Sequence, residues 1–206
     1  MSELLGRPTM RQPALSRTVL QFIAAIALIA AAAMQVSAQS DADAAARRQR
    51  LDGLFAVLKT ASNQDEGDVI VADIWKVWLQ SGSADMDGRM EQVIKLMAHG
   101  LLQHAREALD EIVAAAPQWA EGWNKRATVL FLIGEYDRSL ADIERVLALE
   151  PRHFGALAGI GMIRTEKGEL REALAAYRRA LAVNPFLKER YGLIPALEKE
   201  LGEKPL

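Results

Sequence analysis

Residues 123–151 read WNKRATVLFLIGEYDRSLADIERVLALEP, and this stretch decides the fold. Its apolar residues recur at intervals of three and four, as Leu140 and Ile143 do, which is typical of amphipathic helices. Gly134 interrupts the pattern in the middle, and Pro151 ends it. Glycine adopts a left-handed turn conformation at no steric cost, and proline cannot donate the hydrogen bond that continues a helix. The stretch therefore predicts two helices joined by a tight turn.

The same pattern recurs along the chain with a period of 34 residues. Small residues are expected where two helices approach closely, and large apolar residues fill the space that remains. Regular spacing of this kind indicates a repeat architecture. Five columns keep it over three units: Pro117, Pro151 and Pro185; Gly100, Gly134 and Gly168; Ala105, Ser139 and Ala173; Leu109, Ile143 and Tyr177; and Val93, Ala127 and Gly161.

These units resemble the tetratricopeptide repeat (TPR) family. The resemblance implies an all-α fold, a solenoid of helix-turn-helix repeats coiled into a right-handed superhelix. In the central unit, residues 120–153, the tryptophan of the family pattern is Trp123. The unit that follows has Leu157 at this position, and the unit that precedes has Arg89. The matching positions of the central unit are Trp123, Ala127, Gly134, Tyr136, Ser139, Ile143, Val146 and Pro151, and those of the next unit are Gly161, Gly168, Ala173, Tyr177, Ala180 and Pro185.

The repeat frame divides the chain into segments. Because terminal units of an array must cover an apolar face, we expect caps at both ends. The predicted segments are 1–38, signal peptide; 39–51, spacer and start of the first helix; 52–85, degenerate N-terminal helix pair acting as a cap; 86–119, 120–153 and 154–187, the three clear repeats; and 188–206, C-terminal capping helix and tail.

The first 38 residues predict export. Three arginines precede an apolar run over residues 19–34, and Val36-Ser37-Ala38 forms a small-x-small exit. This order is typical of a cleavable signal peptide, so we predict a periplasmic protein. The alternative is an inner-membrane anchor formed by residues 19–34, although that run falls short of the roughly 20 residues that span a bilayer. A start at Met10 in place of Met1 stays open. Taken whole, the chain resembles signal-bearing TPR proteins of alphaproteobacteria, which begin with a helix pair similar to residues 50–55 and 74–79.

Composition and motifs exclude several function classes. A net charge of −2 offers no basic field for nucleic acid, and the absence of cysteine excludes disulfides and thiolate chemistry. His99 and His104 are five residues apart and flank a turn, so they do not share a helix face as zinc ligands would. The stretch Asp85–Gly88 fails as a calcium loop, because Ile94 stands where a bidentate glutamate is needed. We therefore predict no enzyme, no metal, no cofactor and no small-molecule substrate.

The TPR resemblance implies a concave groove lined by the first helix of each pair, where partners bind. Trp75 and Trp78 have the spacing of core residues, whereas Trp119 lies between repeats and is a candidate contact. A carboxylate clamp needs Lys, Asn and Arg from successive first helices, and only Asn124 and Lys125 have that character. The predicted groove is mainly apolar and rich in methionine, which suits varied apolar partners. Its lining residues are Met90, Ile94, Met97, Trp119, Asn124, Thr128, Phe131, Ala158, Met162 and Thr165.

The expected function is that of an exported adaptor that binds a protein or peptide segment without catalysis. One alternative places the apolar side chains in the core or fills the groove with the N-terminal helix pair. Another is a structural role, in which the repeats self-assemble. Membrane contact is expected only if the leader is retained.

Overall fold

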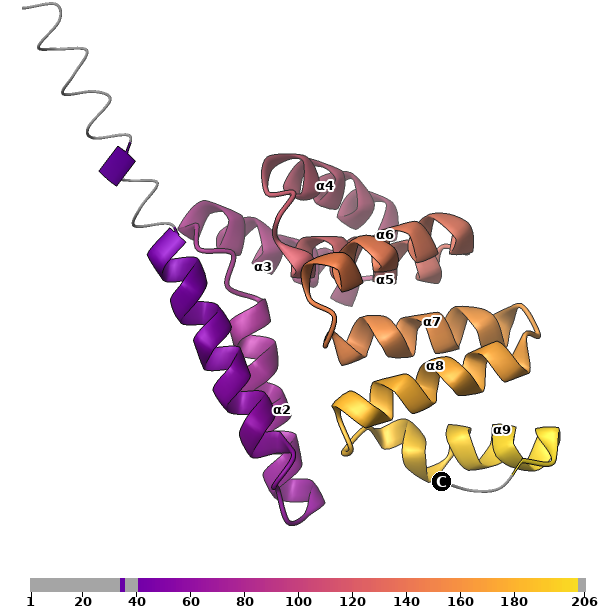
Figure 1. Cartoon of the computed structure of the whole chain (residues 1–206). Helices are drawn as coiled ribbons and strands as arrows, with labels where there is room; N and C mark the ends of the chain where they lie inside the picture. The colour runs from indigo at the N-terminus through magenta and orange to yellow at the C-terminus, as the bar shows by residue number, and fades with distance from the viewer. Residues whose placement is uncertain (1–33, 36–40, 204–206) are drawn as a thin grey trace, which may run out of the picture. The chain divides into compact units, whose positions relative to one another are not determined.

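The computed structural model describes residues 34–35 and 41–203, which fall into two compact units, 1–44 and 45–206. The repeats belong to the second unit (Figure 1). The predicted leader lies outside the described residues apart from residues 34–35. Across the described ranges, no helix is both long enough and apolar enough to cross a bilayer.

Three successive helix pairs form the array (Figure 1). Each second helix packs against the first helix of its own pair, and α4 and α6 also contact the first helix of the following pair. The all-α repeat fold predicted from the 34-residue period is therefore confirmed. The helices are α3 (Ala84–Ala98) and α4 (Leu102–Ala115), α5 (Ala120–Leu132) and α6 (Tyr136–Leu149), and α7 (Phe154–Glu166) and α8 (Leu170–Val183).

The repeated glycines make the turns inside each pair. Gly100, Gly134 and Gly168 have φ angles of 71°, 81° and 73°, in the left-handed region that other residues enter only at a cost. The repeated prolines each follow the last residue of α4, α6 or α8 by two positions. The two columns thus end the first and second helices, as their chemistry predicts.

The small and large columns build the core between paired helices. Ala105, Ser139 and Ala173 are all buried, and the Ser139 hydroxyl donates to the carbonyl oxygen of Ala127 at 2.7 Å. A Cβ atom built on Gly161 would lie 2.7 Å from the Tyr177 ring, closer than side chains tolerate. The glycine therefore permits α7 and α8 to approach with a tyrosine between them.

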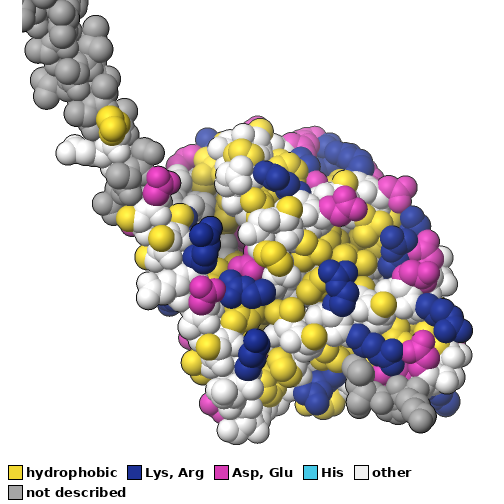
Figure 2. All heavy atoms as spheres, viewed as in Figure 1, with side chains coloured by type: hydrophobic (Ala, Val, Ile, Leu, Met, Phe, Trp, Pro, Cys, Tyr) yellow, Lys and Arg dark blue, Asp and Glu magenta, His cyan; other side chains and the backbone are white. Residues whose placement is uncertain are grey.

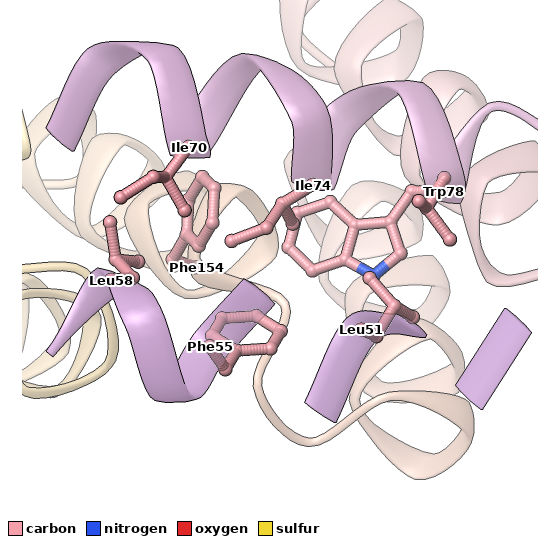
Figure 3. Close-up of a cluster of buried hydrophobic side chains, with 8 residues drawn as sticks. Leu51, Phe55, Leu58, Ile70, Ile74, Trp78 and Phe154 are labelled. Atoms are coloured by element: carbon pink, nitrogen blue, oxygen red, sulfur yellow. The ribbon is translucent and has the colours of Figure 1, made fainter. Parts of the chain in front are cut away.

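The N-terminal helix pair consists of a helix over residues 41–58, of which 45–58 belong to the second unit, and α2 (Gln64–Trp78). The side chain of Asn63 begins α2 by accepting a hydrogen bond from the backbone N–H of Glu66 at 3.0 Å. The two helices share a buried cluster to which the repeats contribute Phe154 (Figure 3). Its other members are Leu51, Phe55, Leu58, Ile70, Ile74, Val77 and Trp78.

Contacts of α2 reach the turns that follow all three repeats. The Trp119 indole donates to the Trp78 carbonyl oxygen at 2.8 Å, and the His153 ring stacks on the Trp78 ring with centroids 4.0 Å apart. The Gln64 amide donates to the Phe186 carbonyl oxygen at 2.8 Å. The role of this pair as a capping, degenerate repeat stays a prediction. Its contacts lie at the turns that follow the repeats, where Trp119, His153 and Phe186 pack against it.

The C-terminal segment is irregular at first and then helical. A short 3-10 helix, η1 (Lys188–Tyr191), leads into α9 (Leu193–Leu201). Ile194 and Leu197 of α9 join the buried cluster around Leu174 and Tyr177 of α8. α9 thus covers the open apolar face of the last repeat.

Candidate binding groove

The first helices of the repeats, α3, α5 and α7, carry three columns of candidate residues with distinct burial. Members of one column are 34 residues apart, so they occupy equivalent places in successive repeats. The column of Met90, Asn124 and Ala158 is buried, and that of Met97, Phe131 and Thr165 is half-buried. The column of Ile94, Thr128 and Met162 is exposed, and we call it the exposed column. Together they mark the surface that the sequence predicts to be the groove, on which Ile94 and Met162 are the exposed apolar side chains.

A pocket opens in this groove between α5 and α7. Its empty volume, including the part open to solvent, is about 380 Å³. Thr128 and Phe131 line it from α5, Gly159 and Met162 from α7, and Ile143 from α6. Since α5 also contacts α7 directly, the pocket lies where two first helices meet. The pocket brings together four of the predicted residues: Asn124, Thr128, Phe131 and Met162.

Hydroxyl groups in and beside the pocket already have partners. The Thr128 hydroxyl donates to the Asn124 carbonyl oxygen at 2.9 Å, and the Ser139 hydroxyl donates to Ala127. One turn further along α7, the Thr165 hydroxyl donates to the Gly161 carbonyl oxygen at 2.8 Å. These donors are directed into the protein, so the pocket offers a ligand mainly apolar surface. Figure 2 shows hydrophobic side chains gathered across the middle of the viewed face, with charged side chains among and around them.

Two predicted contacts do not face the groove. Met90 is only 2% exposed and packs in the core with Val93 and Leu109. Trp119 is 8% exposed, and its indole is held by Trp78. The Met90 side chain points into the core, and Trp119, in the turn between two repeats, contacts the end of α2. Ile94 and Met162, in contrast, are 41% and 43% exposed.

A buried polar cluster lies at one end of the pocket. Glu121, in the first turn of α5, and His153, which precedes α7, are both fully buried. The His153 Nδ1 atom accepts from the backbone N–H of Ala156 at 3.1 Å, which places the ring proton on Nε2. Nε2 then donates to the Glu121 carboxylate at 3.1 Å, and Asn124 Nδ2 donates to it at 3.0 Å. Lys125 Nζ lies 2.9 Å from the other carboxylate oxygen.

This cluster keeps Glu121 ionised. Burial is the largest single influence and raises the pKa of Glu121, but the His153 hydrogen bond and the nearby Lys125 charge outweigh it. The net result is a pKa below the ordinary value. The Lys125 ammonium also lies over the Trp75 ring, 5.3 Å from its centroid. Asn124 and Lys125 are thus already engaged by an internal carboxylate, which argues against a clamp for acidic chain ends.

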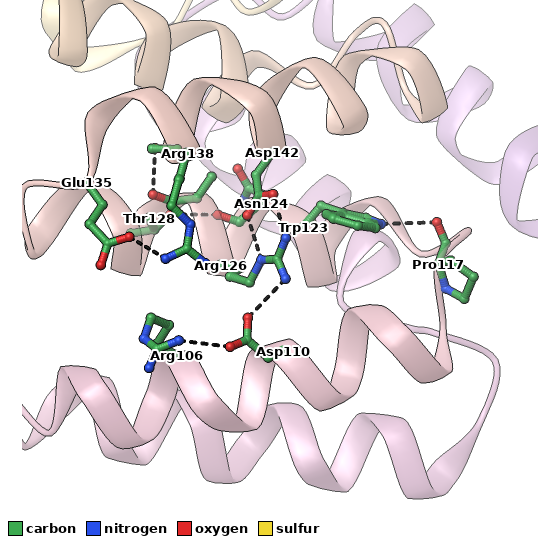
Figure 4. A network of polar contacts seen from close by, with 12 residues as sticks. Arg106, Asp110, Pro117, Trp123, Asn124, Arg126, Thr128, Glu135, Arg138 and Asp142 are labelled. Atoms are coloured by element: carbon green, nitrogen blue, oxygen red, sulfur yellow. Dashed lines mark hydrogen bonds and ion pairs between the residues drawn. The ribbon is translucent and has the colours of Figure 1, made fainter.

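A second charged network ties neighbouring repeats together behind the groove (Figure 4). Arg126 of α5 binds both carboxylate oxygens of Asp142 on α6, at 2.7 and 2.8 Å, and donates to Asp110 on α4 at 3.0 Å. Its guanidinium also lies 4.9 Å from the Trp123 ring centroid. Hydrogen bonding to Asp142 is the main reason that the pKa of Arg126 is raised. Arg126 therefore joins the first repeat to the second through its contacts with Asp110 and Asp142.

Sequence reasoning missed Glu121 and His153. An acidic residue in a first helical turn is ordinary, and it gives no sign that the side chain turns inward. One signal was present for His153, because it falls in the same 34-residue column as Trp119 and Leu187. His99 and His104 are exposed, and in the part of the chain that the structure describes no group of side chains has the composition of a metal site.

Comparison with known proteins decides the family. The tetratricopeptide repeat model matches residues 154–186. A TPR repeat-containing protein of Rhizobium etli is 41% identical over 138 residues, which cover 67% of this chain and 68% of that protein. The chain belongs to the TPR family. Mouse DnaJ homolog subfamily C member 3 is 29% identical over 107 residues, 52% of this chain and only 21% of its own length.

Solved TPR structures share the fold. The first TPR domain of Spaghetti (RPAP3), bound to the HSP90 peptide SRMEEVD, has a TM-score of 0.54 at 20% identity. The match covers 57% of this chain and 94% of that domain. MamA has a TM-score of 0.53 at 22% identity, over 63% of this chain and 76% of its own. At these identities the likeness concerns the TPR fold alone.

Proposed function

We propose that this TPR protein is an exported adaptor that binds an apolar segment of a partner protein in the groove along α3, α5 and α7, without catalysis. The exposed column carries the proposal, because Ile94 and Met162 remain solvent-accessible at equivalent places in the first and third repeats. Covering these two side chains with an apolar segment of a partner would remove apolar surface from water and so favour binding.

The pocket supports the same function. It is lined by Thr128 of α5 and Met162 of α7, two members of the exposed column, so a segment laid along the groove would pass over it. Thr128, the middle member of the column, has its hydroxyl turned back to its own helix. A partner side chain entering here would meet methyl, phenyl and thioether groups. TPR relatives bind peptides: RPAP3 holds an HSP90 peptide in its first such domain.

Capture of the partner tests this function. Full-length protein carrying Ile94→Glu and Met162→Glu is compared with wild type in a crosslinking pull-down from producing cells. The matched control carries Val57→Glu and Val69→Glu, which alter exposed apolar side chains of the N-terminal helix pair, 50% and 64% exposed, outside the groove. We expect wild type and control to retain the same protein and the groove variant to lose it while keeping its helical content.

Retention of the same protein by the groove variant would overturn groove binding. Sedimentation of all three proteins at several concentrations separates a foreign partner from a second copy of the chain. A self-association that only the groove variant lacks would make the groove an assembly surface.

Export rests on the sequence of residues 1–38 and has its own test. We expect N-terminal sequencing of protein recovered from the periplasm to begin at Gln39. Protein that keeps residues 19–34 and sediments with membranes would indicate an anchored adaptor instead.

A further inference from the structure

The polar end of the pocket has the features of an anion site. It lies at the first turns of α5 and α7, where the helix dipoles favour negative charge. Three donors converge there: Asn124 Nδ2 and Lys125 Nζ from α5, and His153 Nε2 from the residue that precedes α7. Asn124 also lines the pocket, so this end is continuous with the groove.

The anion in this site belongs to the protein itself. All three donors converge on the Glu121 carboxylate, which is fully buried. Equivalent positions in the other repeats hold no fully buried carboxylate: Asp87 is half-buried and accepts from Ser81, at 2.6 and 2.8 Å, and Gly155 has no side chain. The carboxylate is therefore a local feature of the central repeat.

We infer that Glu121 is a specificity-determining residue, which makes the groove reject acidic chain ends by filling its own anion site with an internal carboxylate. This inference rests on the proposed function, because it describes which segments that groove accepts. An incoming carboxylate would find the Lys125 charge neutralised and would face the negative charge of Glu121. An apolar segment pays neither cost, so the wild-type groove selects it.

Removal of the internal charge should change the selectivity. In Glu121→Gln the side chain keeps its shape and can still accept from His153, but Lys125 loses its ion pair. The probe is the labelled peptide SRMEEVD, and its control is a copy with Gln for each Glu, Asn for the last Asp and an amidated end. Binding to full-length protein is followed by fluorescence anisotropy.

We expect no saturable binding of SRMEEVD to wild type and a gain of at least about tenfold in affinity for Glu121→Gln, with no gain for the neutral copy. Adding Lys125→Met to Glu121→Gln should abolish the gain. A folded Glu121→Gln that binds neither peptide better, or both equally, would overturn the inference. Equal binding of SRMEEVD by wild type would also overturn it.

A second measurement does not depend on peptide binding. Glu121→Ala leaves a cavity beside the same three donors, so acetate should raise its melting temperature above that in chloride of equal ionic strength. Wild type should show no such difference. Equal melting temperatures of Glu121→Ala in the two salts would show that no anion site exists there.

The adaptor function and the role of Glu121 can each be disproved without the other. Partner capture depends on Ile94 and Met162, whereas the peptide and acetate measurements depend on Glu121 and Lys125. If the groove variant keeps its partner but Glu121→Gln gains the acidic peptide, the adaptor function fails and the role of Glu121 stands. If the groove variant loses its partner and Glu121→Gln does not gain the acidic peptide, the adaptor function stands and only the role of Glu121 fails.

Discussion

The indole N–H of Trp119 donates to the backbone carbonyl oxygen of Trp78 at 2.8 Å, although the two residues are 41 positions apart. This bond joins α2 to the turn between the first and second repeats. The carbonyl lies at the end of α2, where no further helical turn supplies a donor. The two tryptophans therefore couple the N-terminal helix pair to the array.

Trp119→Phe should destabilise the protein by about 1–3 kcal/mol, because it leaves a buried carbonyl oxygen without its donor. The loss is measured by urea unfolding, and hydrogen exchange of α2 should increase with it. Trp123→Phe is the matched control, since its indole donates to the Pro117 carbonyl oxygen at an exposed site. We expect it to cost below about 1 kcal/mol. Equal losses for both variants would contradict a special role for the Trp119–Trp78 bond.

Gly161→Ala should cost about 1–3 kcal/mol, because the new Cβ atom would overlap the Tyr177 ring. Gly88→Ala provides the contrast within another first helix. No atom lies within 4 Å of a Cβ built on Gly88, so alanine there should stabilise the protein by about 0.5–1 kcal/mol. If the repeat requires the close approach of α7 and α8, the melting temperature should fall in Gly161→Ala and rise in Gly88→Ala, each compared with wild type. A stabilised Gly161→Ala would disprove that.

Arg126→Met should destabilise the array by about 3–5 kcal/mol, because it leaves Asp142 buried without its cation. Arg126→Lys should recover only part of the loss, since an ammonium cannot bind both oxygens of a carboxylate in parallel. Asp110→Asn should cost about 1 kcal/mol or less, because the Asp110 side chain is 38% exposed. Denaturant unfolding gives the free energy of unfolding of each variant, and the three values can then be ranked. A ranking with Asp110→Asn as the most damaging would contradict Asp142 as the principal partner.

Stability should fall in acid partly through Glu121. Its pKa in the folded protein lies below the ordinary value of 4.5, so folding favours the ionised form. The stabilisation is complete above the unfolded pKa and is lost as the pH falls through the folded pKa. The gap in unfolding free energy between wild type and Glu121→Gln should therefore narrow below about pH 4.5. Glu91→Gln, which alters an exposed glutamate of α3, is the control measured over the same pH range.

The repeats could be predicted from the sequence because each column has a local cause. Gly134 needs a left-handed turn and Pro151 ends a helix whatever the rest of the chain does. The different burial of the candidate columns could not be predicted in the same way, because Met90, Ile94 and Met162 are all large and apolar. Ile94 and Met162 differ from Met90 only in the direction that each faces.

The position of α2 could not be predicted from that frame. Its partners depend on contacts between distant residues, such as Trp119 with Trp78 at 2.8 Å and Gln64 with Phe186. Trp119 was expected to contact a ligand because its place between repeats suggests exposure. The actual partner, the end of α2, lies outside the repeat pattern, and so does the inward turn of Glu121.

The contacts of α2 with the turns after the repeats also determine when its apolar side chains can become fully buried. Its indole and isoleucine side chains are synthesised before the segments that cover them, and Phe186 and Leu187 emerge more than a hundred residues after Trp75. A linear solenoid can gain each repeat independently of the ends. Here the earliest helices obtain their full cover only when the last repeat has formed, so part of their apolar surface stays uncovered while more than a hundred residues are added.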